Sequence, residues 1–118
     1  MAMAYQESGL SPEAQEIHRA IESLCEEIEA VDWYNQRADA TADENLKAVL
    51  IHNRNEEIEH ASMLIEYLRR IIPEFEEELK TYLFSSAPIT QIEGEETGHE
   101  GGGGEAPSSG DLGIGKIK

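Results

Sequence analysis

Residues 46–71 read LKAVLIHNRNEEIEHASMLIEYLRRI, a stretch with neither glycine nor proline. Its core-facing positions recur at spacings of three and four, the period of a helix with one buried face. Pro73 then ends or kinks this helix, because proline has no backbone N–H to donate. The stripe comprises Leu46, Leu50, Asn53, Glu57, His60 with Ala61, Leu64, Leu68 and Ile71.

A second long helix is expected before this one. Ser11 followed by Pro12 and Glu13 is typical of a helix start, with an N-cap, proline at the first position and acid in the first turn. An apolar stripe runs from it to about Ala38, and Thr41 with Glu44 reads as a capping box for the next helix. The stripe is formed by Ile17, Ile21, Leu24, Ile28 and Val31.

Two long helices with a tight connection predict an antiparallel hairpin in an all-α fold, followed by a short third helix around residues 75–83. A hairpin buries only one side of each stripe, so it should not stand alone. Two copies packed face to face would form a ferritin-like four-helix bundle.

The distribution of glycine divides the chain into two regions of different composition. Nine of the ten glycines fall at or after Gly94, and residues 93–111 hold six acids and no Lys or Arg. We expect a flexible N-terminus at 1–10, a helical domain at 11–92, an acidic Gly-rich linker at 93–111 and a disordered tail. Apolar residues return at alternating places in residues 112–118, which indicates a short docking peptide.

Composition excludes several function classes. The chain has 118 residues, a formal charge of −16 and a single cysteine, Cys25. The acidic surface argues against nucleic acid and anionic membranes as partners and favours cations. No intrachain disulfide, zinc-type cysteine pair, membrane span or signal peptide is expected. These features indicate a cytoplasmic protein of at most one modest domain.

Carboxylates interrupt the apolar stripes. Glu27 lies on the face of the first helix that also presents Leu24 and Val31, and Glu57-x-x-His60 interrupts the second stripe. A carboxylate there needs a proton or a cation to satisfy it. Di-iron carboxylate bundles use a lone Glu from each of two helices and Glu-x-x-His from each of the other two.

One chain therefore supplies half of such a set, and two chains would supply all of it across a two-fold interface. Carboxylate-rich ligands with one imidazole per metal favour iron or manganese over structural zinc. The alternative reading is that Glu27, Glu57 and His60 are exposed helix residues of a very acidic protein.

Residues 26–37 (EEIEAVDWYNQR) and 52–61 (HNRNEEIEHA) resemble the encapsulated ferritins, and the resemblance extends through residues 69–70, 81–84 and 88–90 to the terminal 112–115. It implies a half-ferritin whose homodimer forms a ferroxidase centre with two iron ions, within a ring of ten subunits. It also implies that the protein is cargo of an encapsulin shell protein and works inside an encapsulin nanocompartment that stores the iron.

By this resemblance the iron ligands are Glu27, Glu57 and His60, and Tyr34 lies beside the centre. The metal access path would involve Glu26, Glu29 and Trp33, for which the alternative is a solvated helix face. The encapsulin docking peptide would present Leu112, Gly113, Ile114, Gly115 and Ile117.

A second cation site is a separate hypothesis. His52, Glu56 and Glu59 share a helix face and could bind another ion, with calcium or another divalent ion as the candidate. For the whole protein, the rivals to an iron-oxidising enzyme are a non-catalytic helical adaptor tethered by its C-terminal peptide, and a bundle that binds metal without turnover.

Overall fold

The computed structural model describes residues 6–100, with side chains up to Gly94. In chain order it forms α1 (Pro12–Ala40), α2 (Glu44–Ile71), α3 (Pro73–Tyr82) and α4 (Ile89–Glu100). The chain divides into two compact units between Pro73 and Glu74. None of the helices in the described part is long and apolar enough to cross a bilayer.

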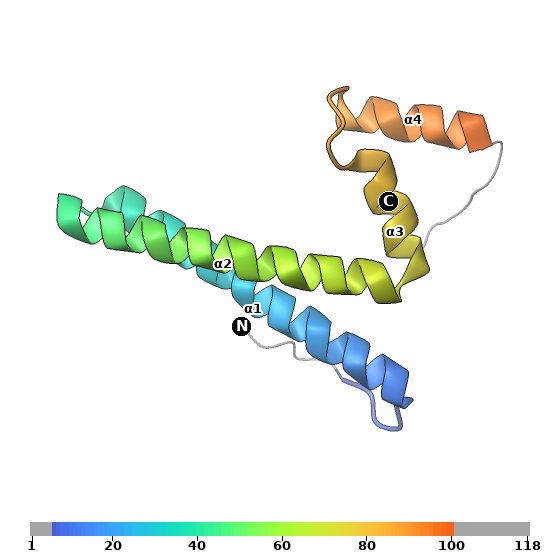
Figure 1. The fold of residues 1–118 in the computed structure, drawn as a ribbon, viewed down its shortest axis with the longest axis horizontal. Coiled ribbons are helices and arrows are strands. Elements are labelled where there is room, and N and C mark those ends of the chain that lie inside the picture. Colours follow the sequence, from blue (N-terminus) through green and yellow to red (C-terminus); the bar gives the residue numbers. More distant parts are fainter. Residues whose placement is uncertain (1–5, 101–118) are drawn as a thin grey trace. The chain divides into compact units, whose positions relative to one another are not determined.

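The first unit is the antiparallel hairpin of α1 and α2, which pack against each other. The helices have 29 and 28 residues, or roughly 42 to 44 Å at the rise of an α-helix. They lie side by side near their connection and diverge toward the start of α1 and the end of α2 (Figure 1). The predicted hairpin is thereby confirmed.

The start of α1 follows the sequence prediction, whereas the start of α2 corrects it. The Ser11 side chain accepts a hydrogen bond from the Ala14 N–H at 3.1 Å, with Pro12 at the first position. The N-cap of α2 is Asp43 and not Thr41, because the Asp43 carboxylate accepts from the Asn45 and Leu46 N–H groups. An ionised carboxylate is a stronger acceptor for those unsatisfied donors than a hydroxyl.

The core between α1 and α2 is small. Its buried members are Ala20, Ala38, Ala61 and Leu68. Alanine lets the two helix backbones approach but buries little apolar area. Eight large apolar side chains of the hairpin remain exposed: Ile28, Trp33, Leu46, Val49, Ile58, Met63, Ile65 and Tyr67. Burying one such side chain is worth about 1.5–3 kcal/mol, so the hairpin offers a surface that favours association.

The second unit contains most of α3 and all of α4. Pro73 begins α3, as expected from the break that it imposes on α2, and the predicted short third helix is present. After α3, Phe84 has a φ of 62° and a fully exposed side chain.

The helix α4 was not predicted. It continues to Glu100, so residues 93–100, which we expected to begin a flexible linker, are helical. The expected docking peptide, residues 112–118, and the start of the expected flexible N-terminus lie outside the described residues.

Candidate metal centre

Glu27 of α1 and Glu57 and His60 of α2 meet at the packed faces of the hairpin. The His60 Nδ1 atom lies 3.3 Å from Glu57 Oε1 and 3.5 Å from Glu27 Oε1. Within the described residues, this is the one group of three or more His, Cys, Asp or Glu side chains whose ligand atoms lie within 4.8 Å of one another. The hairpin thus brings together the residues that the sequence singled out from two different helices.

The local fold explains this convergence. Glu57 and His60 are three residues apart on α2, so they project from one helical turn. A hydrogen bond from Arg54 Nη1 to Asn35 Oδ1 at 2.9 Å joins α2 to α1 one turn before Glu57. Sequence reasoning did not identify the Asn35–Arg54 pair, although Arg54 lies three residues before Glu57 and thus on the same side of the helix.

The cluster is open on one side. The side chains of Glu27 and Glu57 are 27% and 24% exposed, and that of His60 is 45% exposed. Two carboxylates and an imidazole can therefore contact a further group that approaches the hairpin from outside. Such an arrangement suits a site that is completed by another molecule.

The two carboxylates are close enough to compete for one proton. The hydrogen bond with Glu57 raises the pKa of Glu27 above its ordinary value, partial burial and the Glu57 charge raise it further, and His60 opposes them. Desolvation lowers the pKa of His60, but its hydrogen bonds and ion pairs with Glu57 and Glu27 outweigh this, so its pKa lies above 6.5. A bound cation could replace these protons.

Metal binding should therefore depend on pH. Because the pKa of metal-free His60 is raised, its proton competes with a metal ion up to a higher pH than the proton of a free histidine. We expect the affinity for Co(II), a probe that O2 does not readily oxidise in such a site, to rise between about pH 6 and pH 8 with release of protons. Calorimetry in buffers of different ionisation enthalpy measures both quantities. Affinity that does not change with pH would contradict the assignment.

The second proposed cation site is only partly assembled. Glu56 bridges two histidines of α2, with Oε2 3.9 Å from His52 Nε2 and Oε1 3.9 Å from His60 Nε2. Glu59 lies one turn from Glu56 and is exposed. In this geometry, Glu56 lies on the side of His60 opposite the two carboxylates that face Nδ1. The hypothesis of a second site at His52, Glu56 and Glu59 stays a prediction.

The residues of the expected access path lie on α1. Glu26 is exposed, Glu29 is half-buried and the Trp33 side chain is 48% exposed. Tyr34 is half-buried, with the Arg37 guanidinium 5.7 Å from the centre of its ring. Tyr34 follows Glu27 by seven residues, which is roughly 10 Å along a helix. The backbone of one chain thus does not place Tyr34 at the level of the cluster.

Two arginines near the end of α2 form ion pairs with Glu66. Arg69 and Arg70 both donate hydrogen bonds to the Glu66 carboxylate, at 2.7 and 2.8 Å. These bonds lower the pKa of Glu66 to about 2. Glu66 is thus an ion-paired carboxylate at the end of α2, distinct from the metal candidates.

An all-α hairpin that presents two carboxylates and a histidine is consistent with a ferritin-like fold. The EncFtn-like family model matches residues 2–86, so this chain belongs to the EncFtn-like family, the encapsulated ferritins. It is 51% identical over 115 residues to the encapsulated ferritin-like protein of Rhodospirillum rubrum, covering 92% of this chain and 82% of that protein.

One further relative and one solved structure are also similar to this chain. The encapsulin nanocompartment cargo protein EncC of Myxococcus xanthus is 33% identical over 90 residues, which cover 73% of this chain and 67% of that protein. The solved structure of protein ne0167 from Nitrosomonas europaea superposes with a TM-score of 0.71 at 56% identity, covering 74% of this chain and 98% of that one.

Proposed function

We propose that this protein is a ferroxidase that oxidises Fe(II) with O2 at a di-iron centre shared by two copies of the chain. The observation that carries the proposal is the cluster of Glu27, Glu57 and His60, whose ligand atoms lie within 4.8 Å of one another. It is half of the Glu and Glu-x-x-His ligand set of di-iron bundles. Membership of the encapsulated ferritins supports iron as the metal.

The number of ligands favours two copies, because one chain offers only half of a di-iron ligand set. Two chains would contribute four Glu and two His, so four negative charges would neutralise two Fe(II) ions. Oxidation to Fe(III) increases the positive charge by two, and hard carboxylate oxygens stabilise that product. In a single chain the same three side chains would hold one iron ion and leave part of its coordination open to water.

The reaction balances with the two irons as substrate. Each Fe(II) gives up one electron, and one O2 accepts both electrons together with two protons to leave as hydrogen peroxide. The protein's part is to hold the two ions next to each other and to offer carboxylates that favour Fe(III). Tyr34 is proposed as an aromatic side chain near the centre, and Glu26, Glu29 and Trp33 as the access path for the cation.

Assembly supplies the second half of the site. The exposed apolar side chains of the hairpin and the open side of the cluster both support a homodimer. Following the family, we propose that dimers form a ring of ten subunits. A two-fold dimer in which each hairpin faces the other is a four-helix bundle.

Cargo packing would separate oxidation from storage. The relatives named as encapsulated and as encapsulin cargo support an encapsulin shell as partner and a cytoplasmic nanocompartment as location. The docking contact is proposed for Leu112, Gly113, Ile114, Gly115 and Ile117. A ring of bundles has no closed cavity, so oxidised iron would be stored in the shell lumen.

Stopped-flow absorbance with native mass spectrometry tests the proposal. We expect Fe(II) to shift the protein toward an even-numbered assembly without oxygen, and aerobic mixing to give Fe(III) absorbance much faster than buffer does. Oxidation at the rate of buffer alone would refute the ferroxidase. Iron-dependent assembly without turnover would instead favour a bundle that binds metal without oxidising it.

A further inference from the structure

The Arg54 side chain connects the two long helices beside the metal cluster. Its Nη1 atom donates to Asn35 Oδ1 of α1 at 2.9 Å, and its Nε and Nη2 atoms donate to Asn55 Oδ1 at 3.2 and 3.0 Å. A guanidinium has only donors, so both asparagines must turn their amide oxygens toward it. Asn55 thus holds one edge of the guanidinium on α2 while the remaining group reaches α1.

The charge of Arg54 does not suit a neighbouring cation site. Arg54 precedes Glu57 by three residues, which is about 4.5 Å along the helix axis. An arginine guanidinium always carries a positive charge, and a positive charge at this level repels a metal ion. A favourable effect of Arg54 on metal binding can therefore come only from what its hydrogen bonds hold in place.

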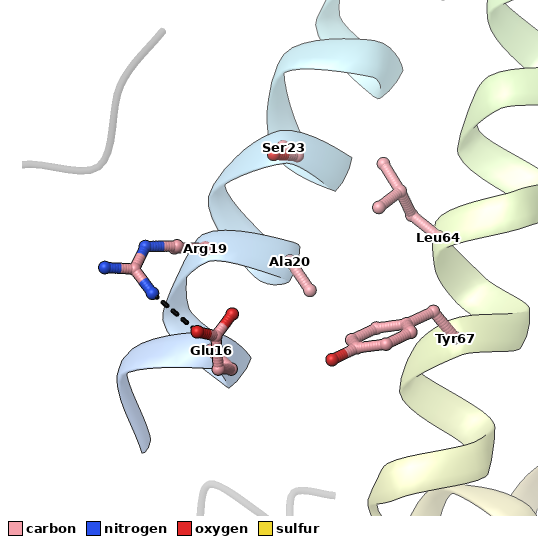
Figure 2. Close-up of a pocket in the computed structure, with 6 residues that line it drawn as sticks. All are labelled: Glu16, Arg19, Ala20, Ser23, Leu64 and Tyr67. Carbon is pink, nitrogen blue, oxygen red and sulfur yellow. Dashed lines mark hydrogen bonds and ion pairs between the residues drawn. The ribbon is translucent and has the colours of Figure 1, made fainter. Parts of the chain in front are cut away.

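On the other side of the cluster, away from the connection of the helices, α1 and α2 leave a shallow groove. Figure 2 shows Ala20 and Ser23 on α1 facing Leu64 and Tyr67 on α2. The groove has a volume of about 260 Å³. Small side chains form low ridges that interlock little with the facing helix, so they resist sliding of one helix along the other only weakly. Packing at the groove therefore constrains the register of the hairpin poorly.

We propose that Asn35 and Arg54 are positioning residues that fix the register of α1 against α2 and thereby hold the metal ligands together. The inference rests on the metal site of the proposed function. Glu27 comes from α1, whereas Glu57 and His60 come from α2, so the 3.5 Å between Glu27 Oε1 and His60 Nδ1 depends on that register. A slide of one residue would move Glu27 by about 1.5 Å, and a misplacement of about 1 Å can already cost 100-fold in catalysis.

The affinity for Co(II), measured by calorimetry, tests the role of Asn35. Asn35→Ala removes the acceptor and should bind Co(II) roughly tenfold more weakly, as is typical when an outer partner of a metal site is lost. Asn35→Asp keeps an acceptor oxygen and should bind at least as tightly as the wild-type chain. Alanine is a better helix former than asparagine, so an effect on helix stability alone predicts no loss.

Gln36→Ala is the matched control. It removes a neighbouring exposed amide whose Nε2 donates to Asp32 Oδ2 at 2.9 Å within α1, so the contact between the helices stays intact. Its affinity for Co(II) should equal that of the wild-type chain. His60→Ala gives the binding that does not involve the cluster.

Arg54→Ala distinguishes positioning from charge by the sign of its effect. Loss of a positive charge alone predicts tighter binding of Co(II), whereas loss of the register contact predicts roughly tenfold weaker binding. Combining Arg54→Ala with Asn35→Ala should cost no more than either change alone, because both remove the same hydrogen bond. Circular dichroism shows whether the helix content is unchanged. If it falls, Asn55→Ala replaces these variants, since it frees the guanidinium and should weaken binding severalfold.

The outcomes separate this inference from the proposed function. Wild-type affinity in Asn35→Ala, tighter binding in Arg54→Ala, or losses that add in the double variant would overturn the positioning role while leaving the ferroxidase intact. Neither Co(II) binding nor Fe(II) oxidation by the wild-type chain would remove both.

Discussion

Replacing Glu57 by alanine is expected to abolish catalysed Fe(II) oxidation. Glu57 Oε1 lies 3.3 Å from His60 Nδ1, and its removal takes one of three ligand side chains from each half-site. Loss of a residue that only supports a metal ligand already costs 10–100-fold in affinity or activity, so losing the ligand should cost roughly 100-fold or more. Initial rates by stopped flow measure the effect.

Two control variants separate the ligand from the charge. Glu57→Gln preserves size and removes the carboxylate, so it should be as inactive as the alanine variant. Glu77→Ala removes one negative charge from an exposed position of α3 and should behave like the wild-type chain. An active Glu57→Gln variant would show that catalysis does not need the negative charge of Glu57.

The same assay on Glu27→Ala distinguishes the enzyme from an adaptor. Since the pKa of Glu27 is raised, its ionised form is disfavoured in the metal-free hairpin. An adaptor with no use for metal should therefore associate equally well or better without this carboxylate. The ferroxidase should lose both oxidation and iron-dependent association, as it should with His60→Ala.

Removing residues 112–118 is expected to abolish loading into an encapsulin shell without changing the rate of Fe(II) oxidation. The cluster lies in the hairpin of residues 12–71, and the proposed docking residues follow it by about forty positions. Co-expression with the shell protein, followed by measurement of the cargo retained in purified shells, shows the loading. Kinetics on the free truncated protein show the rate.

Transfer of the peptide is the matched control. Residues 112–118 fused to an unrelated folded protein should direct that protein into the shell. Loss of both loading and oxidation on truncation would contradict a separate docking segment. Retained loading would place the shell contact elsewhere in the chain.

Local signals made the hairpin and its cluster predictable. Ser11 with Pro12 and the break at Pro73 set helix ends through chemistry that depends on a few neighbouring residues. Glu27 and His60 were recognisable because they occupy positions that helical periodicity assigns to the packed face. Their convergence then followed from the antiparallel pairing of two helices of similar length.

Features that depend on competition between neighbouring residues, or on contacts between residues far apart in sequence, were less predictable. Thr41 and Asp43 are both suitable caps, and only the position of the first turn of α2 decides that Asp43 accepts the two N–H groups. The Asn35–Arg54 hydrogen bond joins residues far apart in sequence, so no local pattern indicates it. The glycines of residues 93–111 led us to expect a linker. The structure instead has α4 beginning at Ile89 and passing through Gly94.

The small alanine core of the hairpin has a kinetic consequence. If a catalytic site is shared by two chains that are mostly unpaired at low concentration, the concentration of active pairs rises with the square of the chain concentration. Mass action sets this dependence. Scattered copies would then oxidise little iron, and so generate little peroxide, whereas crowding copies into one small volume would switch them on. In the proposed shared site, the sparse packing around Ala20, Ala38 and Ala61 would make the rate of oxidation depend on the local concentration of chains.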